Sequence, residues 1–247
     1  MAGDGNRFAV VIPVYNHAAR VAAVVRRALT LDLPLIVVDD GSSDDPAAAL
    51  KPFLPDLRLL RHAFNRGKGA ALLTGFRETA GVADWALTLD ADGQHDPAEA
   101  RRLMAAAAAH GRRPIVVGAR RRMRRARAPW TSRFGRGFSN FWVRTAGGPA
   151  ISDTQSGFRA YPLPETLALD VKARRFQYEI EVLVQARRRG LPVIEVPVGV
   201  IYQPGAERIS HFHPFFDFLR NFGVFSRLIT QRVLGRDKPP GERRPWD

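Results

Sequence analysis

Two aspartates separated by one residue follow a short apolar run in the middle of the chain. The run 85–89 leads into Asp90-Ala-Asp92-Gly-Gln94. Carboxylate and amide oxygens are the ligands that Mg²⁺ and Mn²⁺ prefer, and a cation held there would stabilise a diphosphate leaving group. The pattern therefore predicts a metal site at Asp90, Asp92 and Gln94. The alternative is an acidic turn that caps the helix expected to begin at Pro97.

Polar residues also follow two apolar runs earlier in the chain. Tyr15 and Asn16 come after the first run, and Asp39 and Asp40 end the second. Aspartate oxygens accept hydrogen bonds from a nucleobase N–H or from ribose hydroxyls. Because ligands of open parallel sheets bind beyond the carboxyl ends of the strands, the three polar strand ends indicate one shared site.

Alternating apolar runs and helical patterns must position these residues. Strands are predicted over 8–15, 34–39, 56–61, 85–90, 114–118, 193–196 and 198–202. Helices are predicted over 21–31, 69–79, 97–110 and about 178–189, with a loop and helix over 121–147. Continuous apolar strands separated by helices indicate an α/β fold, in which a mostly parallel sheet is flanked by helices on both faces.

Composition limits the class of protein to which the chain can belong. It has 247 residues, 45% of them hydrophobic, which suits one large α/β domain. It has no cysteine, so disulfides and Cys-based zinc sites are excluded. No window approaches the roughly 20 apolar residues that span a bilayer. We therefore expect a cytoplasmic protein whose membrane contact, at the inner face, is peripheral.

Positive charge is concentrated in one segment. The formal net charge is +14, and residues 101–152 contain thirteen arginines but no lysine, aspartate or glutamate. Such a segment attracts nucleic acid, acidic lipid or phosphate, although a solvated arginine-rich face has the same composition. Its densest part is expected to attract anionic lipid headgroups and comprises Arg121, Arg122, Arg124, Arg125 and Arg127.

Four motifs occur in a fixed order and carry a family resemblance. They are Ile12-Pro-Val-Tyr-Asn, Val38-Asp-Asp-Gly-Ser-Ser-Asp, Asn65-Arg-Gly-Lys-Gly-Ala and Asp90-Ala-Asp-Gly-Gln-His-Asp-Pro. Together they resemble the family 2 glycosyltransferases, and the later Asp153-Thr-Gln-Ser-Gly-Phe-Arg-Ala-Tyr resembles the polyprenol (dolichol) phosphate mannose synthase branch. The resemblance covers roughly residues 8 to 211. It implies a GT-A (Rossmann-like) fold and inverting, metal-dependent transfer of a sugar from a nucleotide diphosphate donor to a polyprenyl or dolichyl phosphate at a membrane surface.

The resemblance also gives individual residues expected roles. The nucleotide would be held by Pro13, Tyr15, Asn16, Asp39 and Asp40. The metal, Mg²⁺ or Mn²⁺, and the diphosphate would be held by Asp90, Ala91, Asp92 and Gln94. The acceptor phosphate would be gripped by Arg120, Arg133 and Arg136. Arg208 falls in a loop expected to contact the diphosphate, where this chain has His211 in place of the family's Lys. Lys68 either touches phosphate or is solvated.

The acceptor decides whether a general base is needed. A phosphate monoester is largely a dianion at neutral pH and can attack the anomeric carbon unaided, whereas a hydroxyl needs a base. Asp153 is the candidate carboxylate for that role. It is favoured instead as a residue that holds a sugar hydroxyl or positions the turn at Ser156.

The chain is expected to divide into a catalytic domain over 1–211, an amphipathic helical segment over 212–234 and a disordered tail over 235–247. The helical segment has one apolar stripe, comprising Phe215, Phe218, Phe222, Phe225, Ile229 and Val233. A stripe rich in Phe with arginines beside it fits a helix lying in a membrane surface, and it equally fits a helix packed on the domain. The aromatic residues at the start of this segment, in His211-Phe-His-Pro-Phe-Phe, favour the membrane.

Three other functions account for part of these patterns. A family 2 transferase could act on a hydroxyl of a glycolipid, with Asp153 as the base. A nucleic-acid-binding protein would use the arginines, but it leaves the acidic strand ends unexplained, so no nucleic acid is expected as a partner. A nucleotidyltransferase would also use a metal and an α/β sheet, but it would release pyrophosphate.

Overall fold

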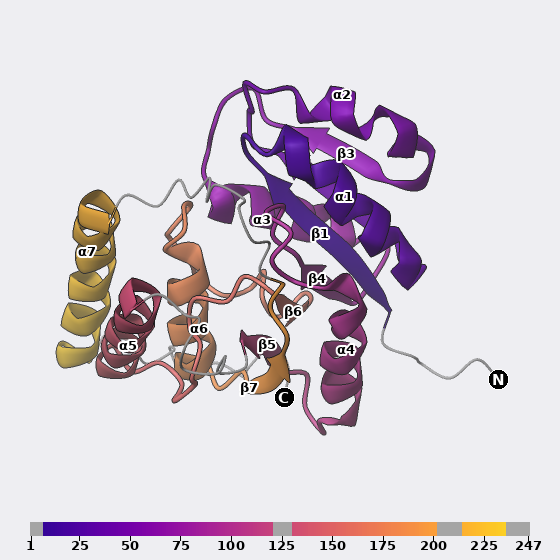
Figure 1. Ribbon diagram of the computed structural model, residues 1–247. Coiled ribbons are helices and arrows are strands. Elements are labelled where there is room, and N and C mark those ends of the chain that lie inside the picture. Colours follow the sequence, from indigo (N-terminus) through magenta and orange to yellow (C-terminus); the bar gives the residue numbers. More distant parts are fainter. Residues whose placement is uncertain (1–6, 121–129, 202–213, 236–247) are drawn as a thin grey trace.

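The computed structural model describes residues 7–120, 130–201 and 214–235, and within the two helices that begin at 130 and 214 it does not describe the side chains of 130–136, 138 and 214–222. The strands form one seven-stranded sheet in the order β3-β2-β1-β4-β6-β5-β7 (Figure 1). They are β1 (Phe8–Val14), β2 (Leu35–Asp39), β3 (Arg58–Arg61), β4 (Trp85–Thr88), β5 (Ile115–Arg120), β6 (Arg159–Pro162) and β7 (Val193–Val198). Every neighbouring pair is parallel except the two pairs that include β6.

Helices cover both faces of this sheet. The helices are α1 (Ala18–Ala28), α2 (Pro46–Leu50), α3 (Lys68–Thr79), α4 (Ala100–Ala109), α5 (Trp130–Thr145), α6 (Tyr178–Arg188) and α7 (Pro214–Val233). Short 3₁₀ turns span Leu29–Leu31, Lys51–Asp56 and Pro97–Glu99. The apolar sides of α1, α2 and α4 pack on one face, and those of α3 and α6 pack on the other. The predicted α/β fold with a mostly parallel sheet is confirmed.

Strand β1 explains why the chain folds in this way. All seven of its residues are buried. Because successive side chains of a strand point to opposite faces, Val10 and Ile12 contact the cluster under α1, while Val11 contacts the cluster under α3. A strand buried on both faces reads as a continuous apolar run. Gly75 of α3 lets the helix approach β1 closely, since a Cβ there would collide with Val11.

Helices α5 and α7 form a further layer outside α6 (Figure 1). Phe225 and Leu228 of α7 are buried against Val143 of α5 and Val184 of α6. The described half of α7 therefore packs on the protein along part of the predicted stripe, and Val233 at its end is 79% exposed. No helix in the described part of the chain is long and apolar enough to span a bilayer.

Among the differences between the structure and the sequence-based elements, three concern strands. Strand β4 ends at Thr88, two residues before Asp90, so the acidic pair lies in the following loop. A single strand, Val193–Val198, stands where two were expected. The antiparallel strand Arg159–Pro162 was not predicted at all, because a charged first residue and a terminal proline do not resemble a buried strand.

Candidate active site

The predicted polar strand ends lie at one edge of the sheet. Strands β2, β1 and β4 are parallel neighbours, and Val14 at the end of β1 pairs with Asp39 at the end of β2. Leu89 continues the contact by donating its N–H to the carbonyl of Val11. The segments that begin at Tyr15, Asp40 and Asp90 therefore leave the sheet at the same edge.

The loop after β1 is fastened to the loop after β2. Asn16 has a positive φ of 53°, and its side-chain oxygen accepts a hydrogen bond from the N–H of Ser43 at 2.9 Å. Its own N–H donates to Ser42 Oγ at 3.0 Å. Tyr15 beside it is half-buried, whereas Pro13 lies buried inside β1. Asn16 thus holds the two loops together.

Asp39 and Asp40 are both buried but have different surroundings. Asp39 Oδ1 accepts a hydrogen bond from the N–H of Ser42 at 2.9 Å. Its Oδ2 lies 3.1 Å from Arg61 Nε, but the two groups are not aligned for a hydrogen bond, and this oxygen has no hydrogen-bond partner among the described residues. Asp39 Oδ2 is therefore a buried oxygen beside the charge of Arg61, and the described residues leave its hydrogen-bonding capacity unused.

The carboxylate of Asp40 is committed to the protein. It accepts hydrogen bonds from the N–H of Arg66 at 2.9 Å and of Gly67 at 2.7 Å, and its Oδ1 lies 2.6 Å from His62 Nδ1. These contacts hold the loop before α3. The predicted nucleotide contact by Asp40 remains a prediction, and this geometry favours a positioning role.

Lys68 lies between two carboxylates at the first turn of α3. Its Nζ is 2.7 Å from Asp90 Oδ1 and 2.8 Å from Glu179 Oε1 of α6. Burial by itself lowers the pKa of Lys68, but the charges of Asp90 and Glu179 outweigh burial, so the pKa lies well above its usual range. Lys68 is therefore positively charged at neutral pH. Its ammonium is largely buried and held by two ion pairs.

The carboxylates of Asp90 and Asp92 have pKa values shifted in opposite directions. Burial by itself raises the pKa of Asp90, but Lys68 reverses the effect and holds that pKa below its usual value. Burial and the nearby charge of Asp90 raise the pKa of Asp92. Among the described residues only Asp90 forms an ion pair with a cation, and a bound divalent cation would lower the repulsion between the two carboxylates.

The donor set of this loop suits Mg²⁺ or Mn²⁺. Gly93, with a φ of 75°, turns the chain so that the N–H of Gln94 donates to Asp92 Oδ1 at 2.9 Å. The carbonyl of Gln94 accepts from the N–H of Ile201 at 2.8 Å, which anchors the loop. Across the described residues, no group of three or more His, Asp and Glu side chains is arranged as a complete metal site. An ion here would keep water or phosphate oxygens as further ligands, as Mg²⁺ usually does.

The backbone of Gly157 closes one side of the acidic pair. A Cβ at this position would collide with both oxygens of Asp90 and would lie 2.8 Å from Lys68 Nζ. The carbonyl of Gly157 accepts a hydrogen bond from Thr88 Oγ1 of β4 at 2.7 Å. Glycine is therefore required for the loop to approach the carboxylate this closely.

Arg120 and Asp153 form a two-pronged ion pair at the end of β5. Arg120 Nε donates to Asp153 Oδ2 at 2.6 Å, and Nη2 donates to Oδ1 at 2.8 Å. The Asp153 side chain is 2% exposed and that of Arg120 is 23% exposed. Such planar pairing fixes both groups, so Asp153 is held in place rather than solvated.

A second arginine, Arg159 of β6, is completely buried without a carboxylate partner among the described contacts. It donates to the carbonyls of Ser156 at 2.7 Å, Thr154 at 2.9 Å and Glu179 at 2.7 Å. It also donates to the hydroxyl of Tyr161 at 3.2 Å. Arg159 thus ties the loop 153–158 to the start of α6, whose Glu179 carboxylate contacts Lys68.

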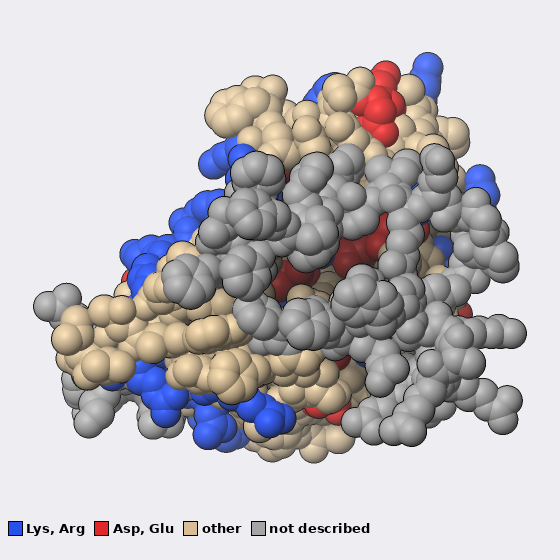
Figure 2. All heavy atoms as spheres, turned by 60° about the vertical axis from the view of Figure 1, so that its left-hand side comes forward, with Lys and Arg blue, Asp and Glu red and all other residues tan. Residues whose placement is uncertain are grey.

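The remaining predicted site residues are placed only in part. Arg133 and Arg136 belong to α5, but their side chains are not described. Arg208, His211 and the arginine cluster over 121–127 lie outside the described residues. Ala91 is buried between the two aspartates. Acidic side chains are visible deep in the middle of the face in Figure 2, and most Lys and Arg side chains lie toward its periphery.

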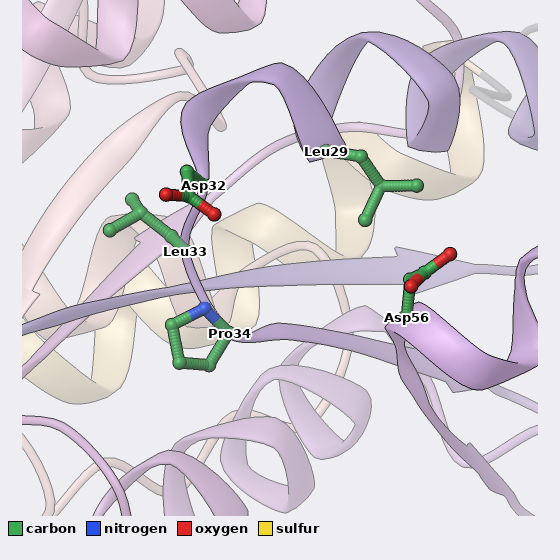
Figure 3. Close-up of a pocket in the computed structure, with 5 residues that line it drawn as sticks. All are labelled: Leu29, Asp32, Leu33, Pro34 and Asp56. Carbon is green, nitrogen blue, oxygen red and sulfur yellow. The ribbon is translucent and has the colours of Figure 1, made fainter.

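A surface depression elsewhere on the molecule is unrelated to these residues. It is lined by Leu29, Asp32, Leu33, Pro34 and Asp56 (Figure 3). These residues precede β2 and β3 and therefore lie at the opposite edge of the sheet. None of the candidate site residues described above lines this depression.

Solved structures show the same fold. Glucosyl-3-phosphoglycerate synthase from Mycobacterium tuberculosis, in complex with phosphoglyceric acid, matches with a TM-score of 0.63 and 20% identity over 96% of this chain and 82% of its own. A mannosyltransferase from Pyrobaculum calidifontis, in complex with GDP-Man and Mn²⁺, matches with a TM-score of 0.59 and 18% identity over 98% of this chain and 68% of its own. The expected GT-A architecture is confirmed.

Sequence relatives extend along most of the chain. An uncharacterised protein of Methanocaldococcus jannaschii is 30% identical over 91% of this chain and 92% of its own length. The UDP-N-acetylglucosamine–dolichyl-phosphate N-acetylglucosaminyltransferase of Methanococcus voltae is 28% identical, over 78% and 85%. The polyprenol monophosphomannose synthase of Mycolicibacterium smegmatis is 29% identical, over 78% and 76%. The model of glycosyl transferase family 2 matches residues 9–165, and the chain belongs to that family.

Proposed function

We propose that this transferase moves a sugar from a nucleotide diphosphate donor to a polyprenyl or dolichyl phosphate, with inversion at the anomeric carbon. The observation that carries the proposal is the Asp90 and Asp92 pair, which lies directly after β4 at the edge of the sheet where ligands of such folds bind. Named relatives in the same family use dolichyl or polyprenyl phosphate acceptors.

Asp90, Asp92 and Gln94 would hold a Mg²⁺ or Mn²⁺ ion. Such an ion supplies positive charge to the departing nucleoside diphosphate, which lowers the barrier to leaving. A solved relative of the same fold contains GDP-Man with Mn²⁺. Asp39 Oδ2, which lies beside Arg61 Nε and accepts no hydrogen bond from the described residues, is the candidate contact with the nucleoside. Asn16 and Asp40 hold the loops around it.

Arg120 is the described residue best placed to meet the acceptor phosphate. Its side chain is partly exposed, while Asp153 fixes its orientation through two hydrogen bonds. A guanidinium that is already held in one geometry loses little entropy when it binds a phosphate. The acceptor oxygen would attack the anomeric carbon from the side opposite the diphosphate, which gives inversion.

A dianionic phosphate needs no general base, and the surroundings of Asp153 agree with such an acceptor. A carboxylate that is buried and paired through both oxygens is a poor proton acceptor. The rival reaction, transfer to a hydroxyl of a glycolipid, would require that carboxylate or another to take a proton. The geometry of the Arg120–Asp153 pair therefore favours the phosphate acceptor.

Exposed aromatic and basic side chains near the site support contact with an anionic membrane surface. Phe64 is 69% exposed and Phe176 is 50% exposed. Arg175 joins their two segments through a hydrogen bond to Asn65 Oδ1 at 3.4 Å. The Phe176 ring lies 5.9 Å from Lys68 Nζ, so this surface borders the acidic pair. Phenylalanine and arginine together are typical of interfacial contacts.

A transfer assay tests the proposal. GDP- and UDP-sugars are supplied with polyprenyl phosphate and Mn²⁺ or Mg²⁺, and the product is tested for the lability to mild acid that marks a glycosyl phosphate. Asp92→Asn should lower transfer by more than about a hundredfold with an unchanged melting temperature. Asp56→Asn, which removes a carboxylate at the opposite edge, is the matched control. Equal activity of Asp92→Asn and the wild type would refute the proposal.

A further inference from the structure

Lys68 connects three structural elements at the site. It begins α3, and its ammonium contacts Asp90 in the loop after β4 and Glu179 in α6 at 2.7 and 2.8 Å. The three side chains are 15%, 26% and 9% exposed, respectively. The contact is therefore largely shielded from water, and its electrostatic energy is larger than that of a surface pair.

Little space is left for Lys68 to move away by itself. The backbone of Gly157 packs directly on the pair formed by Lys68 and Asp90. The aromatic ring of Phe176 lies on another side, 5.9 Å from the ammonium. Glu179 contacts the ammonium as well, and its backbone carbonyl accepts a hydrogen bond from the buried Arg159, which fixes the start of α6.

The ammonium thus neutralises one of the two carboxylates that would bind a divalent cation. We propose that Lys68 is a resident counter-cation, which keeps a divalent metal ion from binding tightly to Asp90 and Asp92 until a nucleoside diphosphate is present. Glu179 is the positioning residue that shares the ammonium and so leaves Asp90 partly available. This inference rests on the proposed metal-dependent transfer.

The electrostatics of the site give the reason. A divalent ion near Asp90 would lie close to the ammonium, and two cations in a shielded site repel each other strongly. A diphosphate brings negative oxygens that attract both the metal ion and Lys68, so the repulsion is compensated only when the nucleotide binds. Metal and nucleotide would therefore bind with positive coupling, each raising the affinity for the other.

The two residues have opposite expected effects when they are replaced. In Lys68→Met the repelling charge is gone, and Asp90 and Glu179 are left without their cation. Mn²⁺ added without nucleotide should therefore bind on the order of tenfold or more tightly than to the wild type. In Glu179→Gln, Asp90 no longer shares the ammonium, so Mn²⁺ should bind several-fold more weakly.

Isothermal titration of Mn²⁺ into the nucleotide-free protein measures these affinities. Melting temperatures with and without Mn²⁺ provide a second readout, because a bound ion stabilises the folded state. Lys68→Met should show a larger Mn²⁺-induced rise in melting temperature than the wild type. In the double variant that combines Lys68→Met with Glu179→Gln, the second substitution should weaken Mn²⁺ binding much less than it does alone, because Glu179 acts through Lys68.

Lys172→Met is the matched control, since Lys172 is 60% exposed and pairs with Asp170. It removes the same charge but should leave Mn²⁺ binding unchanged. If Lys68→Met binds Mn²⁺ no more tightly than the wild type, the inference is wrong. If instead the wild type binds no nucleotide in the presence of Mn²⁺ or Mg²⁺, the proposed function fails, which is a separate outcome. Should Lys68→Met not fold, Lys68→Gln removes the same charge with a polar side chain, and Mn²⁺ binding no tighter than that of the wild type would overturn the inference.

Discussion

Arg120 binds both carboxylate oxygens of Asp153 through Nε and Nη2, on one edge of its guanidinium, at 2.6 and 2.8 Å. Asp153 is almost completely buried, and Glu195 holds the same loop by accepting hydrogen bonds from the N–H groups of Ser152 and Asp153. The pair therefore joins the end of β5 rigidly to the loop before β6. A fixed arginine at this point is suited to orient an anion, and a paired carboxylate is not suited to accept a proton.

Replacement of Asp153 separates positioning from base catalysis. Asp153→Asn keeps the size of the side chain but removes the charge that orients Arg120. We expect the KM for polyprenyl phosphate to rise about tenfold, while kcat falls little and keeps its pH profile. Initial rates over a range of acceptor concentration and pH measure this. Stability should fall by roughly 2 kcal/mol, less than for a fully buried pair because Arg120 reaches solvent.

The opposite kinetic result would support a hydroxyl acceptor. If Asp153 is a general base, kcat should fall about 10²- to 10⁴-fold and lose its dependence on pH, with KM nearly unchanged. Arg120→Lys is a useful companion, because lysine keeps the charge but cannot pair through two parallel hydrogen bonds. Under our proposal it should reproduce the KM effect of Asp153→Asn.

Gly157 offers a test of how closely the acidic pair must be packed. In Gly157→Ala the new methyl group would displace the carboxylate of Asp90, Lys68 or both. Because a displacement of about 1 Å costs up to a hundredfold in rate, kcat/KM should fall by about 10- to 100-fold. Gly111→Ala is the control, since a Cβ there meets open space. Equal rates for both variants would show that the loop is not in close contact with the pair.

Much of the site could be predicted from the sequence because the strands that carry it are continuous apolar runs. Strands β1, β2 and β4 are buried on both faces, and such runs are easily recognised. Because these three strands are parallel neighbours, Tyr15, Asp39 and Asp90 lie at the same edge of the sheet. Local patterns were sufficient for this part because each polar residue directly follows the strand that positions it.

Glu179 and Arg159 could not be found in this way. Glu179 reaches Lys68 only because α6 packs beside α3, a contact between segments distant in the chain. Arg159 is a buried charge inside a strand, and a charged residue lowers the apolar signal by which strands are recognised. Both positions depend on tertiary hydrogen bonds, which have no local pattern.

Arg159 should contribute strongly to stability. Arg159→Met leaves three carbonyl oxygens and the hydroxyl of Tyr161 without their buried donor. We expect the free energy of unfolding to fall by about 3–5 kcal/mol, measured by urea denaturation. The exposed pair of Arg58 with Glu78 provides the control, because Arg58→Met should change stability by less than about 1 kcal/mol.

The two adjacent aspartates after β2 should respond differently to alanine. Asp40→Ala removes the acceptor of two backbone N–H groups and of His62, so it should lower stability by about 2–4 kcal/mol. Asp39→Ala should instead lower nucleoside diphosphate affinity about tenfold, since its Oδ2 accepts no hydrogen bond from the described residues. Calorimetric titration and thermal melting of both variants test the contrast. If Asp40→Ala folds and loses more nucleotide affinity than Asp39→Ala does, Asp40 and not Asp39 is the residue that contacts the nucleotide.

The aromatic surface beside the site should bind anionic bilayers. Phe64→Ser and Phe176→Ser each remove an exposed apolar ring, so co-sedimentation with phosphatidylcholine vesicles containing phosphatidylglycerol should fall about three- to tenfold for each. Val82→Ser is the matched control, because Val82 is 50% exposed but precedes β4 and so lies at the opposite edge of the sheet. Vesicles of phosphatidylcholine alone should bind the wild type more weakly, since the arginines next to these rings then have no anionic headgroups to contact. If both Phe variants sediment as the wild type does, the acceptor must reach the site from another face of the protein.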